Sequence, residues 1–407
     1  MGIVNDYFSF QNGYAFKSVD FTENGEYKII KIKELKDGSV KFFDDTAEIN
    51  PSCDFDIEKY IIRKGDVLFA LTGDPVSKPN PLSWVGRVSY YTHDEPALLN
   101  QRVCKAVPKG SVPNEYLYYF FRQESESFKL ASKATGSASQ ANISTKTIEQ
   151  HKMDIPDKDK MDKIVSVLRN IDEKIENNNQ INRNLSEQMQ AIFGSIFYSE
   201  MEKENKASLG DYLYIKGRIG WKGLKKEEYL SESEYRIING ESLTVTGIDW
   251  NKAGYISEER YIESPEIMLQ EGDILISKDG TIGKIGYVNK LDKPTSVASG
   301  IFVVRNLKPE EVSTVFIYCL LNSDYFKSFI VSRTEGSVIP HLYQKDFVTL
   351  EIPILSQEQI ELFNSTVVPL FESFFSNQTE NIRLAALRDS LLPKLMSGEL
   401  DVSDLNI

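Results

Sequence analysis

The chain has 407 residues, with 60 acidic against 47 basic side chains and a formal net charge of −13. A hydrophobic content of 41% with 11% aromatic residues excludes wholesale disorder, and the length fits roughly two to three domains. The acidic balance argues against a simple basic nucleic-acid binder, and no apolar run approaches the roughly 20 residues that a membrane span needs.

The start of the chain and the cysteines predict a cytoplasmic location. Met1–Phe10 contains no basic segment followed by an apolar one, so we expect no secretion signal. The three cysteines are scattered and odd in number, which is typical of a reducing compartment and offers no metal-type spacing.

Residues 1–156 predict a strand-rich α/β (α+β) domain. Short β-branched and aromatic segments such as Tyr27–Ile32 and Val67–Leu71 are separated by Gly and Pro. A helix is expected over Glu115–Gln123, because Pro113-Asn114 precedes it.

Residues 157–205 predict one long helix of a coiled coil. Seam residues recur with alternating steps of four and three, at Ile164, Leu168, Ile171, Ile175, Asn178, Asn182, Leu185, Met189, Ile192 and Ile196. At 1.5 Å per residue such a helix would measure roughly 50 Å, so we expect it to set a distance between two globular parts.

Residues 206–355 repeat the pattern of the first domain, with strand-like Ile274–Ile276 and Gly300–Val304 and the helical run Val315–Leu321. Landmarks return in the same order: Asp6-Tyr7 as Asp211-Tyr212, Gly65-Asp66 as Gly272-Asp273, Gly136-Ser137 as Gly336-Ser337, and Ile155-Pro156 as Ile352-Pro353. The offset stays between about 197 and 208 residues, as one duplication with small insertions would leave it. Two similar modules suggest two similar binding events.

Residues 356–407 predict a second seam helix. Its seam residues are Phe363, Val367, Leu370, Phe374, Asn377, Asn381, Leu384, Arg388, Leu391 and Leu395. Arg388 stands where an apolar residue was due. Pro369 and Pro393 lie inside the helix, so we expect them to kink or interrupt it.

Two successive seam positions are Asn in both helices. An Asn in a seam costs stability unless it meets a polar partner, so matched Asn layers fix register and partner choice. We therefore predict that the helices pack antiparallel, with Asn178 and Asn182 facing Asn377 and Asn381. Exposed Asn residues in a fraying stretch are the alternative.

The acidic charge is unevenly distributed. Residues 157–205 carry 7 basic and 10 acidic side chains, and residues 356–407 carry 3 and 8, so the two helices hold −8 of the total. The remaining domains are nearly balanced and can gather Lys and Arg on one face.

The sequence predicts no catalytic residue and no metal site. The only histidines, His93, His151 and His341, have no metal-binding spacing. Gly283-Lys284 lacks the Ser or Thr and the earlier Gly of a phosphate-binding loop. Asn80-Pro81 matches only part of the signature of amino-methyltransferases, and no cofactor loop accompanies it.

Several long windows contain no acidic residue and combine Lys and Arg with Gln, Asn and aromatic residues. Cations bind phosphates, while Gln, Asn and Arg form bidentate hydrogen bonds with base edges. An ordinary solvated surface is the alternative for each single residue, and core packing for Trp84 and Trp221. The predicted DNA-binding residues are Lys78, Asn80, Arg87, Gln101, Arg102, Lys133, Ser137, Ser139, Gln140, Asn142, Lys216, Arg218, Trp221, Lys222, Lys278, Lys284, Arg333, Ser337, His341, Tyr343, Gln344 and Lys345.

The whole pattern resembles the DNA specificity (S) subunit of Type I restriction-modification systems, and the resemblance covers essentially the entire chain. It is carried by the duplicated order of the landmarks above, together with Gly217–Leu224, Asn100–Val103 and the ending Leu391–Leu400. It implies two target recognition domains, residues 1–156 and 206–355, each followed by a conserved spacer helix, residues 157–205 and 356–407. The implied fold is a pseudo-two-fold internal repeat joined by two long antiparallel coiled-coil helices.

The resemblance also implies a non-catalytic subunit that reads a bipartite double-stranded DNA target. It would assemble with two methyltransferase (M) subunits, which bind S-adenosylmethionine, and with restriction (R) subunits, which use ATP and Mg; no cofactor is expected in this chain. The alternatives are a coiled-coil adaptor with two protein-binding α/β domains that never touches DNA, a self-contained nuclease or methyltransferase, and the specificity chain of a related combined restriction enzyme.

Overall fold

The computed structural model describes residues 2–52, 55–78, 80–137, 139–219, 223–334 and 341–403. The contacts within the chain divide it into two units. Unit 1 comprises Met1–Glu176 and Asn381–Ile407, and unit 2 comprises Asn177–Glu380.

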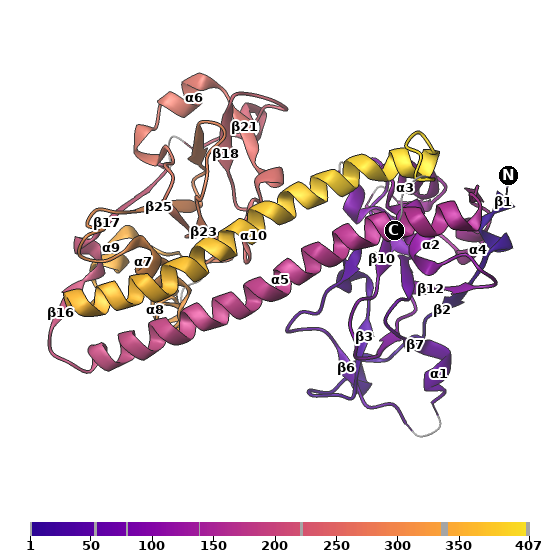
Figure 1. Ribbon diagram of the computed structural model, residues 1–407, viewed down its shortest axis with the longest axis horizontal. Coiled ribbons are helices and arrows are strands. Elements are labelled where there is room, and N and C mark those ends of the chain that lie inside the picture. Colours follow the sequence, from indigo (N-terminus) through magenta and orange to yellow (C-terminus); the bar gives the residue numbers. More distant parts are fainter. Residues whose placement is uncertain are drawn as a thin grey trace. The chain divides into compact units, whose positions relative to one another are not determined.

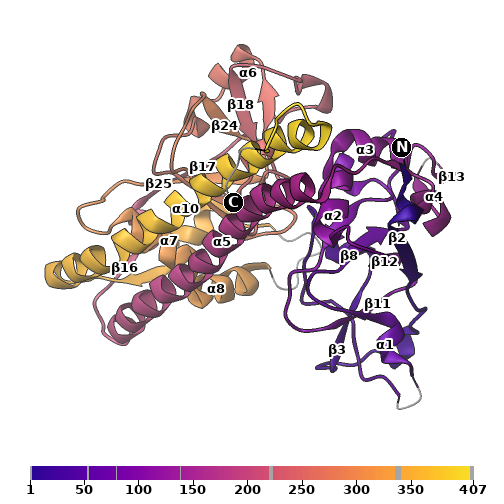
Figure 2. The same cartoon turned by 45° about the vertical axis from the view of Figure 1, so that its right-hand side comes forward.

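Unit 1 is built on two mixed sheets with flanking helices (Figures 1 and 2). The larger sheet has the order β2 (Phe8–Asn12), β12 (Val103–Pro108), β8 (Val67–Ala70), β10 (Val88–Tyr90), β5 (Ser39–Val40), β4 (Leu35–Lys36). The second has the order β6 (Glu48–Ile49), β3 (Tyr27–Ile30), β11 (Ala97–Leu99), β7 (Ile61–Ile62). Smaller elements are β1 (Gly2–Ile3) with β15 (Lys152–Met153), the sheet of β13 (Thr135–Ser137), β14 (Gln140–Asn142) and β9 (Thr72–Gly73), and the helices α1 (Ile57–Tyr60), α2 (Asn114–Arg122), α3 (Glu124–Ala131) and α4 (Thr145–Glu149).

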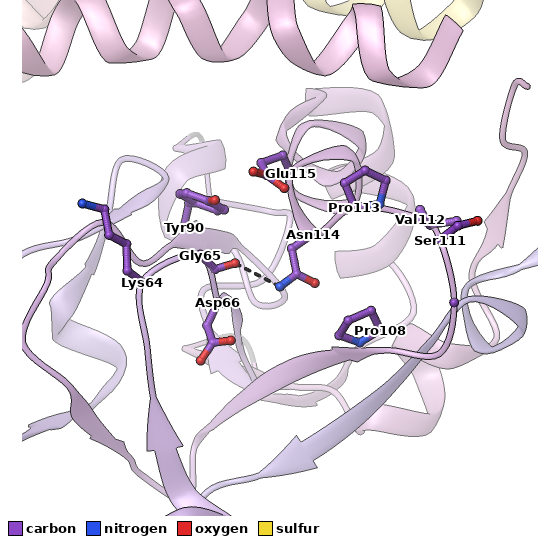
Figure 3. A pocket seen from close by; sticks show the side chains of 11 residues that line it. Lys64, Gly65, Asp66, Tyr90, Pro108, Ser111, Val112, Pro113, Asn114 and Glu115 are labelled. Atoms are coloured by element: carbon purple, nitrogen blue, oxygen red, sulfur yellow. Dashed lines mark hydrogen bonds between the residues drawn. The ribbon is translucent and has the colours of Figure 1, made fainter. Parts of the chain in front are cut away.

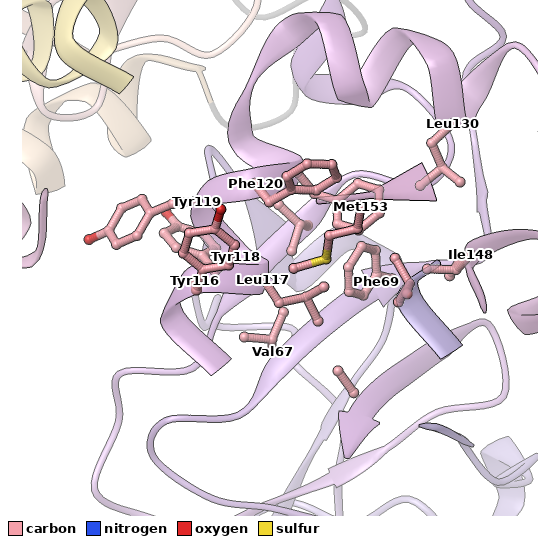
Figure 4. Packing of buried hydrophobic residues seen from close by; sticks show 14 of the residues in the cluster. Val67, Phe69, Tyr116, Leu117, Tyr118, Tyr119, Phe120, Leu130, Ile148 and Met153 are labelled. Carbon is pink, nitrogen blue, oxygen red and sulfur yellow. The ribbon is translucent and has the colours of Figure 1, made fainter. Parts of the chain in front are cut away.

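The core of unit 1 lies between α2 and the larger sheet (Figure 4). Six successive α2 residues, Tyr116 to Phe121, are buried, and they pack with Val67, Phe69 and Met153. Phe69 and Phe121 meet edge to face with ring centroids 5.1 Å apart. Burial of so many large side chains fixes α2 on the sheet and therefore the loops at the sheet edge.

Unit 2 repeats this connectivity. Its main sheet has the order β17 (Leu213–Gly217), β25 (Ile301–Asn306), β22 (Ile274–Ser277), β23 (Ile285–Tyr287). The remaining elements are β21 (Gly254–Ile256), β18 (Tyr235–Ile238) and β24 (Thr295–Val297) in one sheet, β16 (Lys206–Ser208) with β26 (Glu351–Pro353), β19 (Leu243–Thr244) with β20 (Gly247–Ile248), and the helices α6 (Glu258–Ile262), α7 (Thr314–Asn322), α8 (Asp324–Thr334) and α9 (Gln344–Val348). β2, β12, β8 and β10 thus correspond to β17, β25, β22 and β23. The predicted duplication is confirmed.

The repeated Gly-Asp landmark is a tight turn that starts the central strand of each unit. Gly65 and Gly272 both have a φ of +93°, a backbone conformation that glycine adopts readily. The Asp66 carboxylate accepts from the backbone N–H of Arg63 at 2.8 Å, and the Asp273 carboxylate accepts from that of Gln270 at 2.7 Å. The same turn therefore leads into β8 and into β22.

The two long helices are α5 (Lys158–Met201) and α10 (Gln357–Ser397), and each contributes to both units (Figure 1). In unit 1 Arg388 pairs with Asp172, and in unit 2 Asn377 contacts Asn182 while Gln359 contacts Glu200. Residue numbers rise along α5 as they fall along α10, so the helices are antiparallel. The predicted fold class, two similar α/β domains joined by antiparallel coiled-coil helices, is confirmed.

We expected Pro369 and Pro393 to kink or interrupt the second helix. Interruption was wrong, because α10 is one helix of 41 residues, whereas a kink stays a prediction. A proline removes one backbone donor and crowds the preceding turn. Around Pro369 the buried side chains of Phe363, Val367 and Phe371 hold the helix against the unit 2 core and outweigh that cost. Among the described residues, none of the helices is both long enough and apolar enough to cross a membrane.

Candidate nucleic-acid interface

Loops of unit 1 converge at one edge of the larger sheet, where β8 ends and β10 and β12 begin. The backbone N–H of Leu71, just past β8, donates to Arg102 O at 2.9 Å, and that of Ile143 donates to Leu71 O at 3.0 Å. The Gln101-Arg102 turn and the β13–β14 hairpin therefore lie on either side of Leu71. Gln101, Arg102, Gln140 and Asn142 are all exposed.

The β13–β14 hairpin carries four of the predicted residues. β14 pairs with β9, and Thr72 Oγ1 donates to Asn142 Oδ1 at 2.7 Å. The hydroxyls of Ser137 and Ser139 lie 3.1 Å apart, and the backbone N–H of Gln140 donates to Ser137 Oγ at 3.3 Å. These contacts fix the hairpin while the Gln140 side chain and Lys133, just before β13, face solvent.

The segment between β9 and β10 adds Lys78, Asn80 and Trp84 to this edge. Trp84 is 5% exposed, packs against Phe128, and donates its indole N–H to Lys78 O at 2.8 Å. Asn80 Oδ1 accepts from the backbone N–H of Leu82 at 3.1 Å. Trp84 thus packs in the core, which was the alternative to DNA binding for this residue, and it anchors the loop. The side chain of Lys78 remains exposed.

Arg87 and Lys284 occupy equivalent positions, immediately before β10 and β23, and both hold a neighbouring loop. Arg87 donates to the backbone carbonyls of Ile32 at 2.8 Å, Ser83 at 3.1 Å and Leu35 at 3.2 Å. Burial lowers the pKa of its guanidinium. Lys284 donates to Gly240 O at 3.2 Å. In this structure both cations connect backbone segments, and neither is fully exposed.

The same edge of unit 2 shows the same contacts. The backbone N–H of Lys278 donates to Gly300 O at 2.9 Å, and that of Leu342 donates to Lys278 O at 3.2 Å, as in the Leu71 contacts of unit 1. His341 Nδ1 pairs with Asp279 Oδ1. His341 and Asp279 therefore correspond to Asn142 and Thr72, and the Lys278 ammonium lies over the Phe302 ring, 5.0 Å from its centroid.

The other predicted residues of unit 2 differ in exposure. Arg218 is 2% exposed and donates to Val297 O at 3.2 Å, with Ser264 and Ser296 hydroxyls at 3.4 and 3.5 Å. Burial, followed by the charge of Arg260, lowers its pKa. Lys216 is partly buried over the Tyr214 ring.

The segment around α9 presents exposed side chains. Tyr343, Gln344 and Lys345 lie at the start of α9, and the Lys345 ammonium lies 5.4 Å from the Tyr343 ring centroid. Arg333 at the end of α8 is exposed and donates to Thr349 Oγ1 at 2.9 Å. Trp221, Lys222 and Ser337 lie outside the described residues.

Three residues at these edges escaped the sequence prediction. Thr72 and Asp279 directly contact the predicted Asn142 and His341. Tyr14, 43% exposed, accepts at its backbone carbonyl from the Gln101 N–H at 2.9 Å. Aligning the two copies along β8 and β22 would have identified the first two, because each stands two residues beyond the strand end.

A shallow pocket lies at the opposite edge of the unit 1 sheet (Figure 3). Among its lining residues, Asn114 donates to Gly65 O at 3.0 Å, and Asp66 lies 3.4 Å from the ammonium of Lys105, which is outside the pocket. These contacts stabilise the Gly-Asp turn. Over the described ranges, no cluster of His, Cys, Asp and Glu is suited to hold a metal ion.

Comparison with known proteins gives consistent results. A family model described as the Type I restriction modification DNA specificity domain matches residues 3–187 and 200–362. The Type I restriction enzyme MjaIX specificity subunit of Methanocaldococcus jannaschii is 27% identical, over 76% of this chain and 74% of the relative. The EcoBI specificity subunit of Escherichia coli is 24% identical, over 96% and 83%.

A crystal structure of the Type I restriction-modification S subunit from M. genitalium has the same fold. The TM-score is 0.55 at 20% sequence identity, and the match covers 97% of this chain and 94% of that one.

Proposed function

Because the chain belongs to the family of Type I restriction-modification DNA specificity subunits, we propose that it reads a bipartite DNA target and performs no catalysis itself. One half of the target is read by each unit. The loops that read the bases are those at the ends of β8 and β22.

The observation that supports this proposal most strongly is the repeated sheet edge. In both units the same backbone contacts bring two chain segments against the residue after the central strand. These segments carry exposed Gln101, Arg102, Gln140 and Asn142 in unit 1, and Tyr343, Gln344 and Lys345 follow the equivalent segment in unit 2. Side chains of these types read base edges and neutralise phosphates.

The long helices suit two further roles in this proposal. A continuous α5 of 44 residues antiparallel to α10 of 41 residues would set the spacer between the half-sites. Their acidic surface suits protein partners better than phosphates. We propose that they bind two M subunits, which would supply S-adenosylmethionine-dependent methylation of adenine, and that R subunits join with ATP and Mg.

Binding to duplex DNA tests the proposal directly. The chain would be mixed with its partner methyltransferase, and fluorescence anisotropy would follow a labelled target duplex between about 50 and 200 mM salt. We expect affinity to fall steeply with salt and to drop when either half-site is scrambled. Binding that ignores both half-sites would refute sequence reading, and no DNA binding at all would favour a protein-binding adaptor.

A further inference from the structure

The helix–helix contacts in the two units are built from corresponding layers, and the layer that contains Asp172 and Arg388 differs in chemistry between them. Residues of α5 and α10 correspond at an offset of 199, so Asn178 and Asn182 of one helix match Asn377 and Asn381 of the other. The Asn182–Asn377 contact is 2.9 Å long. The Asn residues themselves are alike in both helices and do not distinguish one helix from the other. The 2.6 Å hydrogen bond from Asn178 to Glu380 Oε2 has no counterpart, because Glu380 corresponds to Ile181.

The layer of Asp172 and Arg388 in unit 1 is polar. Arg388 Nη1 donates to Asp172 Oδ1 at 2.7 Å, and the Tyr119 hydroxyl of α2 donates to Asp172 Oδ2 at 2.9 Å. The Arg388 side chain is only 13% exposed and that of Asp172 28%. A second carboxylate, Asp389, lies beside Arg388 but is largely exposed. The pair is therefore shielded from water on most sides.

The equivalent layer in unit 2 is apolar. Offset 199 relates Asp172 to Phe371 and Arg388 to Met189, and both residues are buried in the unit 2 core. Tyr119 and Cys319 stand at the same distance from the N-caps of α2 and α7, and Cys319 is fully buried. The Phe371 ring packs against Tyr287 and Tyr318, with centroids 4.8 and 5.1 Å away.

We propose that the Tyr119–Asp172–Arg388 layer is an identity lock, which makes the first half of the chain pair with the second half and not with another copy of itself. Two first halves paired in the same antiparallel way would place Asp172 against Met189 of the other copy. Two second halves would place Arg388 against Phe371. Each wrong pairing removes one partner of a shielded ion pair. Asp172 would keep the Tyr119 hydroxyl and Arg388 the largely exposed Asp389, but each charge would lose its main counter-charge and face an apolar side chain instead, which is unfavourable.

The lock is independent of DNA recognition, so its test needs no DNA. A protease site is inserted between Lys203 and Glu204, an exposed segment just after α5, in the full chain. Cleavage yields a first half that ends at Lys203 and a second half that begins at Glu204. Cleaved chains whose first half is either unlabelled or isotopically labelled are mixed in urea and refolded together by dilution. Native mass spectrometry then identifies which halves have paired.

We expect each first half to pair with a second half. Pairs of two first halves should be at least ten-fold rarer than random association of the halves would give. The variant Y119C/D172F/R388M copies the apolar layer that already folds in unit 2, and its halves should form first–first pairs freely. The matched control I192L also copies a seam residue of the other helix, Leu391, but leaves the lock intact and should keep the selectivity. Statistical pairing of the unaltered halves, or unchanged selectivity in the triple variant, would overturn the proposal.

The intact chain provides a second readout that does not depend on refolding of the halves. A double-mutant cycle compares D172F, R388M and the double variant. Either single substitution removes one member of the ion pair and leaves the other charge without it. Each single variant should therefore have a lower urea midpoint than the double variant. Strictly additive effects would show that Asp172 and Arg388 do not act as a unit.

Discussion

The Thr72 hydroxyl donates a 2.7 Å hydrogen bond to Asn142 Oδ1, and the equivalent positions of unit 2 carry the pair Asp279 and His341. The backbone around both pairs makes the same contacts. The duplicated fold thus holds a different polar pair at the same place of each sheet edge, which is what the proposed reading of two different half-sites would need.

The hairpin of unit 1 should read the first half-site. We predict that Q140A changes the bases accepted there and leaves the second half-site intact, because Gln140 is exposed on a hairpin that is otherwise fixed. A bidentate Gln–adenine contact contributes about 1–3 kcal/mol of discrimination. Methylation-motif mapping measures this, with Q344A as the matched variant for the second half-site. If Q140A instead weakened DNA binding equally at all sequences, Gln140 would contact the phosphate backbone and not the bases.

Arg87 should act by holding its loops and not by contacting DNA. Its three hydrogen bonds go to backbone carbonyls, so R87M should lower the free energy of unfolding by about 1–3 kcal/mol. The salt dependence of DNA binding should stay unchanged while discrimination at the first half-site declines. R102A is the contrasting variant: as an exposed cation, Arg102 should contribute about one unit to the salt slope if it binds phosphate. A reduced slope for R87M would contradict the assignment.

The Asn layer should cost stability when only half of it is removed. Asn182 is 7% exposed, accepts from Asn377 at 2.9 Å and donates to Phe374 O at 3.0 Å. N377L leaves the Asn182 carbonyl oxygen without this donor, so we expect a loss of about 1–3 kcal/mol in urea unfolding. N182L/N377L should recover part of that loss. I181A, at a site 47% exposed, is the control and should change little.

His151 should make unit 1 less stable in mild acid. It is 2% exposed between Phe120 and Phe121, with Nε2 2.9 Å from Glu126 Oε2. Burial lowers the pKa of His151, against the opposing effect of the Glu126 hydrogen bond. The unfolded chain therefore binds the proton first, near the ordinary value of about 6.5, and stability falls as the pH falls below it.

A comparison with H151Q isolates this effect. The unfolding free energy of the unaltered chain should decline more than that of H151Q between pH of about 7.5 and about 5.5. Glu126, whose pKa is held low by Lys129 and His151 against the effect of burial, stays ionised over this range. Parallel declines in the two proteins would exclude His151 as the cause.

Much of the fold was predictable because it follows from the periodic spacing of apolar residues in the sequence. The seam of α5, the strands β8 and β22 and the helices α2 and α7 follow directly from apolar spacing. The continuity of α10 through Pro369 was not predictable, since it depends on side chains packed against the helix from elsewhere. Partner choice escaped prediction in the same way: Arg388 interrupts the seam pattern, yet Asp172 on the other helix explains it.

The candidate site was less predictable than the fold. Residue type and the lack of acidic neighbours selected Gln140 and Arg102 as candidates, and both are exposed. The same criteria could not separate them from Arg87 and Arg218, which hold backbone segments. Exposure is set by long-range contacts, which a local window does not contain.

Removal of one matched heptad from both helices tests the central claim most directly. Within unit 2, Asn182 contacts Asn377 and Asn178 contacts Glu380, so deleting residues 177–183 of α5 together with residues 376–382 of α10 should keep the remaining seam layers of each unit in register. The helices lose roughly 10 Å, which corresponds to about three base pairs. Genome-wide mapping of methylated adenine, with the partner methyltransferase present, compares the two chains. We predict a two-part motif whose halves are unchanged and whose spacer is altered; an unchanged spacer, or a single continuous motif, would contradict the account.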